Sequence, residues 1–189
     1  MRETDMQLSY QVIFTRRKTM GLEIRKGRLI VRVPVGTSRR MIEQMIRGKR
    51  SWIESHLAKS LEQARDTSHM EKLSAEELRV LGDEAAKLIP ERIRYYAPLI
   101  GVIPGRITIR NQRTRWGSCS SKGNLNFNCL LMLAPREVLD SVVVHELCHL
   151  KELNHSEKFY QEVYRVFPDY DRCHRWLKEN GHKLLSRMG

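Results

Sequence analysis

The stretch His145-Glu146-Leu147-Cys148-His149, followed six residues later by His155, decides the fold. On a helix that turns about 100° per residue, side chains four positions apart point only about 40° apart, so His145 and His149 can bind one cation from a single face. Glu146 lies about 100° round from His145, where it need not bind the cation and can accept a proton from a water. This is the HExxH pattern of zinc-dependent hydrolases. We therefore predict a catalytic Zn²⁺ site, one ion per chain, with Glu146 as general base.

A catalytic zinc ion takes three protein ligands and keeps a fourth position open. We predict His155 as the third ligand, because a chain that leaves the helix near Leu153 can fold back on the metal. Asn154 is the residue there that most readily adopts a left-handed conformation, and Ser156 can cap the helix that follows. The other candidates for the third ligand are His174, His182, Glu152 and Glu157.

The helix that carries the motif, predicted over residues 135–153, has an apolar arc. A surface helix that happens to hold two histidines is the alternative interpretation. Imidazoles that continue an apolar arc are half-buried, however, and burying them without partners is costly. A metal ion removes that cost. Cys148, about 60° from His145 and about 100° from His149 around the helix, is assigned to helix packing. The arc consists of Leu139, Val143, Leu147 and Leu150.

The amino-acid composition indicates which binding partners and which cellular compartment fit this chain. The 189 residues include 34 Lys and Arg against 22 Asp and Glu, and the net charge of +12 favours anionic partners. Nucleic acid is compatible with this charge, but no motif supports it and no platform for stacking bases is visible; a solubilising surface explains the charge equally well. No apolar run approaches 18 residues, so we expect no membrane partner. Four cysteines without a CxxC pair, and the lack of a secretory signal, favour a cytoplasmic protein.

The chain is predicted to be an α+β protein with two parts. Residues 1–66 form β-strands plus a helix: residues 9–35 alternate between apolar and polar, and residues from Thr37 or Ser38 to about 65 repeat with helical spacing. A polar stretch separates them from a metal-dependent hydrolase domain at residues 73–189. There, Ser74 and Glu77 make a capping box for a long helix that Pro90 kinks or interrupts. Strands at 106–111 and 125–129 precede the metal helix, and the apolar pattern after Pro168 indicates a final pair of helices.

A run of small and basic residues lies between those two strands, Arg113-Thr114-Arg115-Trp116-Gly117-Ser118. Its glycine indicates a tight turn and a close backbone approach. We predict that the substrate contacts Arg113, Arg115, Trp116 and Ser118. The two arginines orient the substrate or polarise a carbonyl, or alternatively pair with acids of the fold. A strand that ends beside the metal helix can also present an edge to which an extended polypeptide adds.

Several separated segments resemble one family. The run RTRWGSCSSKGNLNFN (113–128), the helix VVVHELCHLKELNHSEKFY (142–160) and the late PDY and HRWL segments are similar to the YgjP-like (DUF45) family of zinc metallopeptidases, which is related to the SprT-like and WLM proteases. The runs at 16–34 and 46–53 extend the resemblance over nearly the whole chain. It implies a zincin-like α+β fold, zinc bound by His145, His149 and His155, and Glu146 as general base. Metzincins share the histidine spacing but carry a glycine where this chain has Glu152.

Three functions compete at this point. The first is a zinc peptidase acting on a polypeptide. The second keeps the metal and the base but hydrolyses an anionic small molecule, a nucleoside triphosphate, because four arginines lie near the expected active-site strands; no phosphate-binding loop supports it. The third is a non-enzymatic basic protein that binds nucleic acid and holds a closed structural zinc, for which a fourth ligand such as Cys173 or His174 would be needed.

Overall fold

The structure, a computed structural model, describes residues 9–25 and 27–188 of the chain. The chain divides into two compact units, Met1–His69 and Met70–Gly189. Within the described residues, no helix is long and apolar enough to cross a lipid bilayer.

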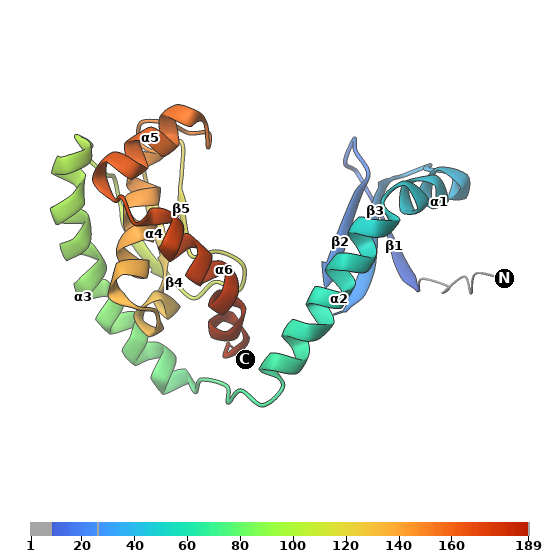
Figure 1. Ribbon diagram of the computed structural model, residues 1–189, viewed down its shortest axis with the longest axis horizontal. Helices are drawn as coiled ribbons and strands as arrows, with labels where there is room; N and C mark the ends of the chain where they lie inside the picture. Colours follow the sequence, from blue (N-terminus) through green and yellow to red (C-terminus); the bar gives the residue numbers. More distant parts are fainter. Residues whose placement is uncertain (1–8, 26, 189) are drawn as a thin grey trace. The chain divides into compact units, whose positions relative to one another are not determined.

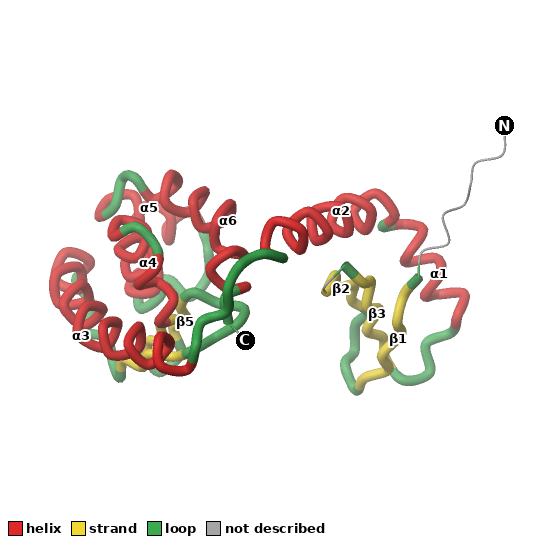
Figure 2. Tube along the Cα trace, turned by 90° about the horizontal axis from the view of Figure 1, so that it is seen from below, coloured by secondary structure: helices red, strands yellow, loops and turns green. Residues whose placement is uncertain are grey.

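The N-terminal unit is a three-stranded sheet covered by two helices (Figure 2). Its strands are β1 (Tyr10–Thr15), β2 (Gly21–Arg25) and β3 (Arg28–Pro34), with β3 in the middle, parallel to β1 and antiparallel to β2. The helices are α1 (Arg39–Gly48) and α2 (Arg50–Thr67). Alternate residues of β3 pack on one face of these helices, as the strand pattern predicts. The core they share consists of Leu29, Val31, Val33, Ile42, Ile46 and Ile53.

The single helix predicted from residue 37 or 38 to 65 is wrong in one respect, because the structure breaks it at Lys49. Lys49 has φ −117° and ψ 18°, outside the helical region, and it ends α1 and begins α2. The preceding residue is Gly48, and a glycine costs about 1 kcal/mol relative to alanine inside a helix. Ser38 caps α1 by accepting a hydrogen bond from the Met41 amide.

The second unit begins with a long helix, α3 (Ala75–Ile100), capped by Ser74 and Glu77 as predicted. Gly101, at φ 78°, ends it in the left-handed conformation. Of the two alternatives predicted at Pro90, a kink or an interruption, the interruption is wrong: both Pro90 and Pro98 lie inside one continuous helix. A proline inside a helix removes a backbone hydrogen bond and costs about 3 kcal/mol, which packing of a long apolar face can offset. That face consists of Leu81, Ala85, Ile89, Ile93 and Ala97.

A small sheet and four further helical segments complete this unit. The strands are β4 (Ile107–Arg110), β5 (Gly117–Cys119) and β6 (Leu125–Asn128), with β6 in the middle and β5 at an edge. The 3-10 helix η1 (Cys129–Leu133) leads to the motif helix α4 (Arg136–Cys148), and α5 (Glu157–Val166) and α6 (Tyr170–Ser186) follow. The motif helix thus ends before the predicted residue 153, and the predicted final helix pair is one continuous helix, since a single apolar face runs along its length.

The motif helix lies at the centre of the second unit. In Figure 1, α4 runs between α3 and α6 with α5 across its end, and β5 also packs against it. Residues on every side of α4 are therefore buried, Val138, Leu139, Val143, Val144 and Leu147 among them, rather than the single arc that the sequence indicated. Cys148 is also fully buried, which confirms its assignment to helix packing. An imidazole on this helix is consequently held in one place by its neighbours.

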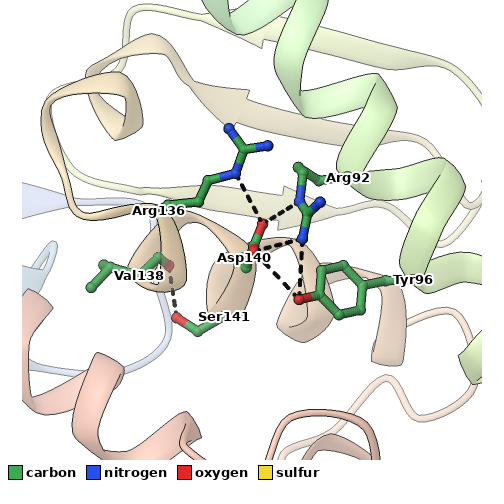
Figure 3. Close-up of polar contacts among 6 residues, drawn as sticks. All are labelled: Arg92, Tyr96, Arg136, Val138, Asp140 and Ser141. Carbon is green, nitrogen blue, oxygen red and sulfur yellow. Dashed lines mark hydrogen bonds and ion pairs between the residues drawn. The ribbon is translucent and has the colours of Figure 1, made fainter.

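A buried ion pair joins α4 to α3 (Figure 3). The Asp140 carboxylate, in a residue only 6% exposed, accepts hydrogen bonds from Nε and Nη2 of Arg92 at 2.7 and 2.8 Å. The Tyr96 hydroxyl lies 3.4 Å from the same carboxylate, and Arg136 approaches it at 3.8 Å. Because a two-pronged pair of this kind fixes both distance and orientation, it sets the position of α4 against the long helix.

Candidate active site

Three imidazoles meet at the C-terminal end of α4. The Nε2 atom of His145 lies 3.2 Å from that of His149 and 3.1 Å from that of His155, and the three form one group whose possible ligand atoms all lie within 4.8 Å of one another. A tetrahedral zinc ion with Zn–N bonds of about 2.0–2.1 Å separates its nitrogen ligands by about 3.3 Å. The structure therefore brings together the three residues that the sequence proposed as ligands.

The hydrogen bonds of the rings fit a metal site. Nδ1 of His149 donates to the backbone carbonyl of Glu152 at 3.0 Å, which leaves its Nε2 lone pair directed at the cluster. Nδ1 of His145 lies 2.7 Å from the Tyr170 hydroxyl oxygen, and donation to that oxygen leaves its Nε2 lone pair free in the same way. Two lone pairs that face one another across 3.2 Å repel unless a cation lies between them. These donors thus fit a divalent metal.

Burial keeps His145 and His149 neutral. It lowers the pKa of His145 to about 3, and the neighbouring imidazoles lower it further in the same direction. Burial also lowers the pKa of His149. A neutral imidazole is the form that binds a metal, so these two rings are ready to bind one at neutral pH without first losing protons.

One aromatic ring packs against all three imidazoles. Phe159, fully buried on α5, has its ring centroid 5.0, 4.5 and 4.9 Å from those of His145, His149 and His155. The Ser156 hydroxyl accepts a hydrogen bond from the Phe159 amide, so the cap predicted from the sequence begins the helix that carries this ring. The sequence placed Phe159 only in the core of a short helix; its contact with all three imidazoles comes from tertiary structure.

None of the rival ligands belongs to the cluster. Glu152 contributes its backbone carbonyl to His149, not its carboxylate. His174 lies against Tyr170, with ring centroids 5.6 Å apart, and Glu157 begins α5 at an exposed position. Among the described residues the group has three members, so the fourth coordination position has no protein ligand.

The carboxylate of Glu146 lies between α4 and the edge strand β5. Glu146 is 6% exposed, and burial raises the pKa of its carboxyl to about 7, against the opposing effect of the nearby Arg115. Its side chain rests on Gly117: a Cβ at that position would lie 2.6 Å from Oε1 of Glu146. Only glycine leaves room for the carboxylate here. The close backbone approach that the sequence predicts for this run is therefore the approach of Gly117 to Glu146.

We expect Gly117→Ala to lower kcat about 100-fold, because the added methyl group displaces the Glu146 carboxylate by about 1 Å from its position. Steady-state kinetics and zinc content check this. Ser118→Ala is the matched control on the same strand, since its side chain lies on the other face and its hydroxyl contacts Asn126. Equal activity of the two variants would contradict the assigned contact.

The raised pKa of Glu146 makes a prediction for the metal-free protein. The pKa of this carboxyl rises from 4.5 in the unfolded chain to about 7 in the folded protein, so the folded state holds the proton more tightly. The resulting contribution to stability is fully present below pH 4.5 and is lost as the pH rises through 7. Relative to Glu146→Gln, metal-free wild type should lose about 3 kcal/mol of unfolding free energy between pH 4.5 and 8. Urea denaturation with a chelator at both pH values measures it; parallel pH dependence of the two proteins would refute it.

A cavity of about 250 Å³ opens beside Glu146 and His145. Of the predicted substrate residues, Arg115 and Trp116 line it. Arg113 is exposed and does not, and the Ser118 hydroxyl accepts a hydrogen bond from the Asn126 side chain on the far face of β5. Substrate contact by these two residues stays a prediction without support from the geometry. The remaining lining residues are Gly117, Ser141, Val142, Tyr170, His174 and Leu177.

Sequence reasoning missed the contribution of α6 to this cavity. Tyr170, His174 and Leu177 are spaced at i, i+4 and i+7, so they lie on one face of the helix and all line the cavity. That spacing was present in the sequence as a signal. Dividing the segment into two helices, as the sequence analysis does, hides this common face.

Tyr170→Phe should weaken zinc binding about 10- to 100-fold, because the hydroxyl that holds the Nδ1 side of His145 is lost. Competition titration against a chromogenic chelator measures the affinity directly. Tyr164→Phe is the control, since it removes a hydroxyl bonded to Asp171 at an exposed position away from the histidines. Unchanged affinity in Tyr170→Phe would show that the ring alone, through packing, positions His145.

Comparison with known proteins gives one family and three relatives. A model of the YgjP-like, metallopeptidase domain matches residues 18–86 and 78–180. The UTP pyrophosphatase of Escherichia coli (strain K12) is 36% identical over 58 residues, 31% of this chain and 35% of that protein, so this chain spans about a third of the length of the curated relative that it matches.

Two solved structures also resemble the chain. They are the metallopeptidase zymogens abylysin of Pyrococcus abyssi and jannalysin of Methanocaldococcus jannaschii, with TM-scores of 0.45 and 0.44 at 22% and 23% identity. Each match covers 49% of this chain, and 94% and 96% of the respective relatives.

Proposed function

We propose that this chain, which belongs to the YgjP-like metallopeptidase domain family and is a metallohydrolase, is a zinc-dependent peptidase with Glu146 as its general base. The observation that carries the proposal is the position of one buried carboxylate. Glu146 lies against the edge strand β5, and it lines the same cavity as His145, one of the three clustered imidazoles.

The three histidines supply the ligands for the metal. His145, His149 and His155 present three ring nitrogens and no protein group completes the set among the described residues, which is the arrangement of a catalytic rather than a structural zinc site. When bound, zinc would lower the pKa of a water and polarise a carbonyl oxygen.

The residues of the chain perform the proton transfer. An Oε atom of Glu146 accepts a proton from the attacking water and then delivers it to the nitrogen of the leaving amine. Burial suits the carboxyl for both steps, because a pKa of about 7 lets it take and release a proton near neutral pH. Trp116 and the α6 side chains of the cavity exclude bulk water from this exchange.

The edge position of β5 favours a polypeptide substrate. β5 pairs only with β6 among the described strands, so its other edge is available to an extended chain. A polypeptide added there would run past Gly117, and therefore past the Glu146 carboxylate that lies on it. The unpaired edge of β5 therefore supports the proposal that a substrate adds as a strand.

A second candidate function is hydrolysis of a nucleoside triphosphate at the same site. Two observations favour it: Arg115 lines the cavity beside Glu146, and the Escherichia coli protein that matches 58 residues is a UTP pyrophosphatase. An arginine in the cavity can pair with a phosphate. A closed structural zinc in a nucleic-acid-binding protein has less support, because neither Cys173 nor His174 belongs to the metal group.

One experiment separates the two hydrolases. Zinc-loaded protein is incubated with an unfolded casein-like polypeptide and with a nucleotide panel, and new peptide termini and released pyrophosphate are measured by mass spectrometry and a coupled assay. We expect peptide cleavage that Glu146→Gln abolishes. Pyrophosphate release without peptide cleavage would overturn the proposal.

Arg115→Ala sharpens the comparison. In a peptidase it should change KM only a few-fold, whereas loss of a phosphate contact should raise KM for a nucleotide by about tenfold or more. The variant therefore assigns the role of Arg115 whichever substrate is cleaved.

A further inference from the structure

The positive charge of the chain is concentrated in its N-terminal unit. Residues 1–69 contain 15 Lys and Arg against seven Asp and Glu, so that this unit carries a net charge of +8 out of the total of +12. The larger second unit carries the remaining +4. A solubilising surface would distribute the charge over both units, and the concentration points to an anionic partner of the smaller one.

A cavity of about 270 Å³ on this unit lies between β2 and the junction of α1 with α2. We call it the Trp52 groove. Its lining residues are Met20, Gly21, Leu22, Met45, Lys49 and Trp52. None of these is acidic, and neither helix has an acidic residue in its first turn.

Two cations flank the Trp52 groove from elements far apart in the sequence. The Arg17 guanidinium lies over Gly21, with Nη1 3.4 Å from the position of a Cβ there, and Lys49 lines the opposite side at the break between the helices. Both residues are exposed, and neither side chain has an ion-pair partner in the part of the chain that the structure describes. Arg16 and Lys18, also exposed, extend the charge along the same loop.

An aromatic ring completes the arrangement. Trp52 is 39% exposed and stacks on the His56 imidazole, with centroids 4.1 Å apart and ring planes at 26°. Lys49 precedes it by three residues, within one helical turn, so the cation and the indole lie side by side. An indole beside unpaired cations is the combination with which proteins bind single strands: bases stack on the ring and phosphates pair with the charges.

We propose that the Trp52 groove binds single-stranded nucleic acid. A nucleotide joins a flat apolar base to an anion one sugar away, and the groove offers a flat ring and methionine walls for the first, with Arg17 and Lys49 for the second. An acidic polypeptide would use the cations but leave the indole without a flat partner. Because the groove lies wholly in the N-terminal unit, this proposal stands apart from the chemistry assigned to α4.

The test uses the full chain and fluorescence anisotropy with labelled 12-residue oligo-dT and oligo-U between 50 and 200 mM salt. Each phosphate contact that is removed makes the slope of log affinity against log salt concentration about 0.7 units shallower. Arg17→Ala with Lys49→Ala removes two such contacts, so the slope should become about 1.4 units shallower. The control, Lys87→Ala with Arg94→Ala, removes the same charge from exposed positions on α3 and should leave the slope unchanged.

Trp52→Ala should weaken oligonucleotide binding about 5- to 150-fold, and Trp52→Phe, which keeps a ring, should recover most of the loss. Circular dichroism verifies that each variant is folded. Equal losses in the Arg17/Lys49 and Lys87/Arg94 variants would overturn the proposal, as would no effect of Trp52→Ala. Polyglutamate that binds as tightly as the oligonucleotides would assign the groove to an acidic polypeptide instead.

Discussion

Glu146→Gln is expected to lower kcat/KM of the zinc-loaded protein about 10²- to 10⁴-fold while zinc content stays at one ion per chain. The amide has the shape of the carboxylate and fits on Gly117 in the same way, but its oxygen cannot take and hold a proton. The hydrogen bonds of the three histidines that we propose as ligands do not go to Glu146, so their nitrogens keep their positions. Loss of activity with retained metal separates proton transfer from metal binding.

Two further variants serve as controls for this result. Glu157→Gln makes the same chemical change at an exposed position at the start of α5, eleven residues along the chain, and should retain full activity. His145→Ala should lose both metal and activity, since it removes the nitrogen that lies near both others. The measurements are steady-state kinetics and metal analysis of the purified proteins. Activity of Glu146→Gln within tenfold of wild type would remove Glu146 from the role of base.

The metal cluster could be predicted because its geometry is local. Two histidines at i and i+4 share a face on any α-helix, and the choice of His155 needed only a ligand type and a chain reversal. The structure places the three nitrogens together although the helix ends at Cys148, earlier than expected. The prediction did not depend on where the helix ended, because the turn that follows it has enough freedom to return the chain to the site.

What surrounds the cluster could not be predicted, because it depends on contacts between distant parts of the chain. Tyr170 meets His145 across 25 residues, and Gly117 meets Glu146 across 29 residues in a strand of only three. A strand that short has no alternation to detect, so the run that contains it was interpreted as turns. The Trp52 groove could not be predicted either, because it also depends on residues that are distant in the sequence. Its cation Arg17 lies 35 residues before the ring of Trp52.

The helix interruption predicted at Pro90 failed for a different reason. The sequence shows the local cost of a proline but not the packing that offsets it. In the structure, Ile89 and Ile93 on either side of Pro90 are buried against the core, so the apolar face continues through the proline. This long helix in turn supplies Arg92, the partner of the only charged residue besides Glu146 that is buried among the described residues.

Asp140→Ala is expected to lower the free energy of unfolding of the second unit by about 3–5 kcal/mol, the cost of leaving one member of a buried ion pair without its partner. Arg92, with a side chain 23% exposed, would lose both of its hydrogen bonds to the carboxylate, and Tyr96 would lose a neighbour of its hydroxyl. For a unit of this size the loss corresponds to a melting temperature about 10 °C lower. Urea denaturation of the metal-free protein measures it without a contribution from zinc binding.

Arg136→Ala is the matched control for the Asp140 variant. Arg136 approaches the same carboxylate at 3.8 Å but its side chain is 47% exposed, so its removal should cost less than about 1 kcal/mol. Replacing both members of the buried pair, Arg92→Met with Asp140→Leu, should recover most of the stability, because apolar side chains of similar volume leave no charge unpaired. If the double variant is as unstable as Asp140→Ala, then α4 is held to α3 by the direction of these hydrogen bonds rather than by filling the space between the helices. In that case zinc affinity should fall with stability, since α4 carries His145 and the residues that follow it lead to His149 and His155.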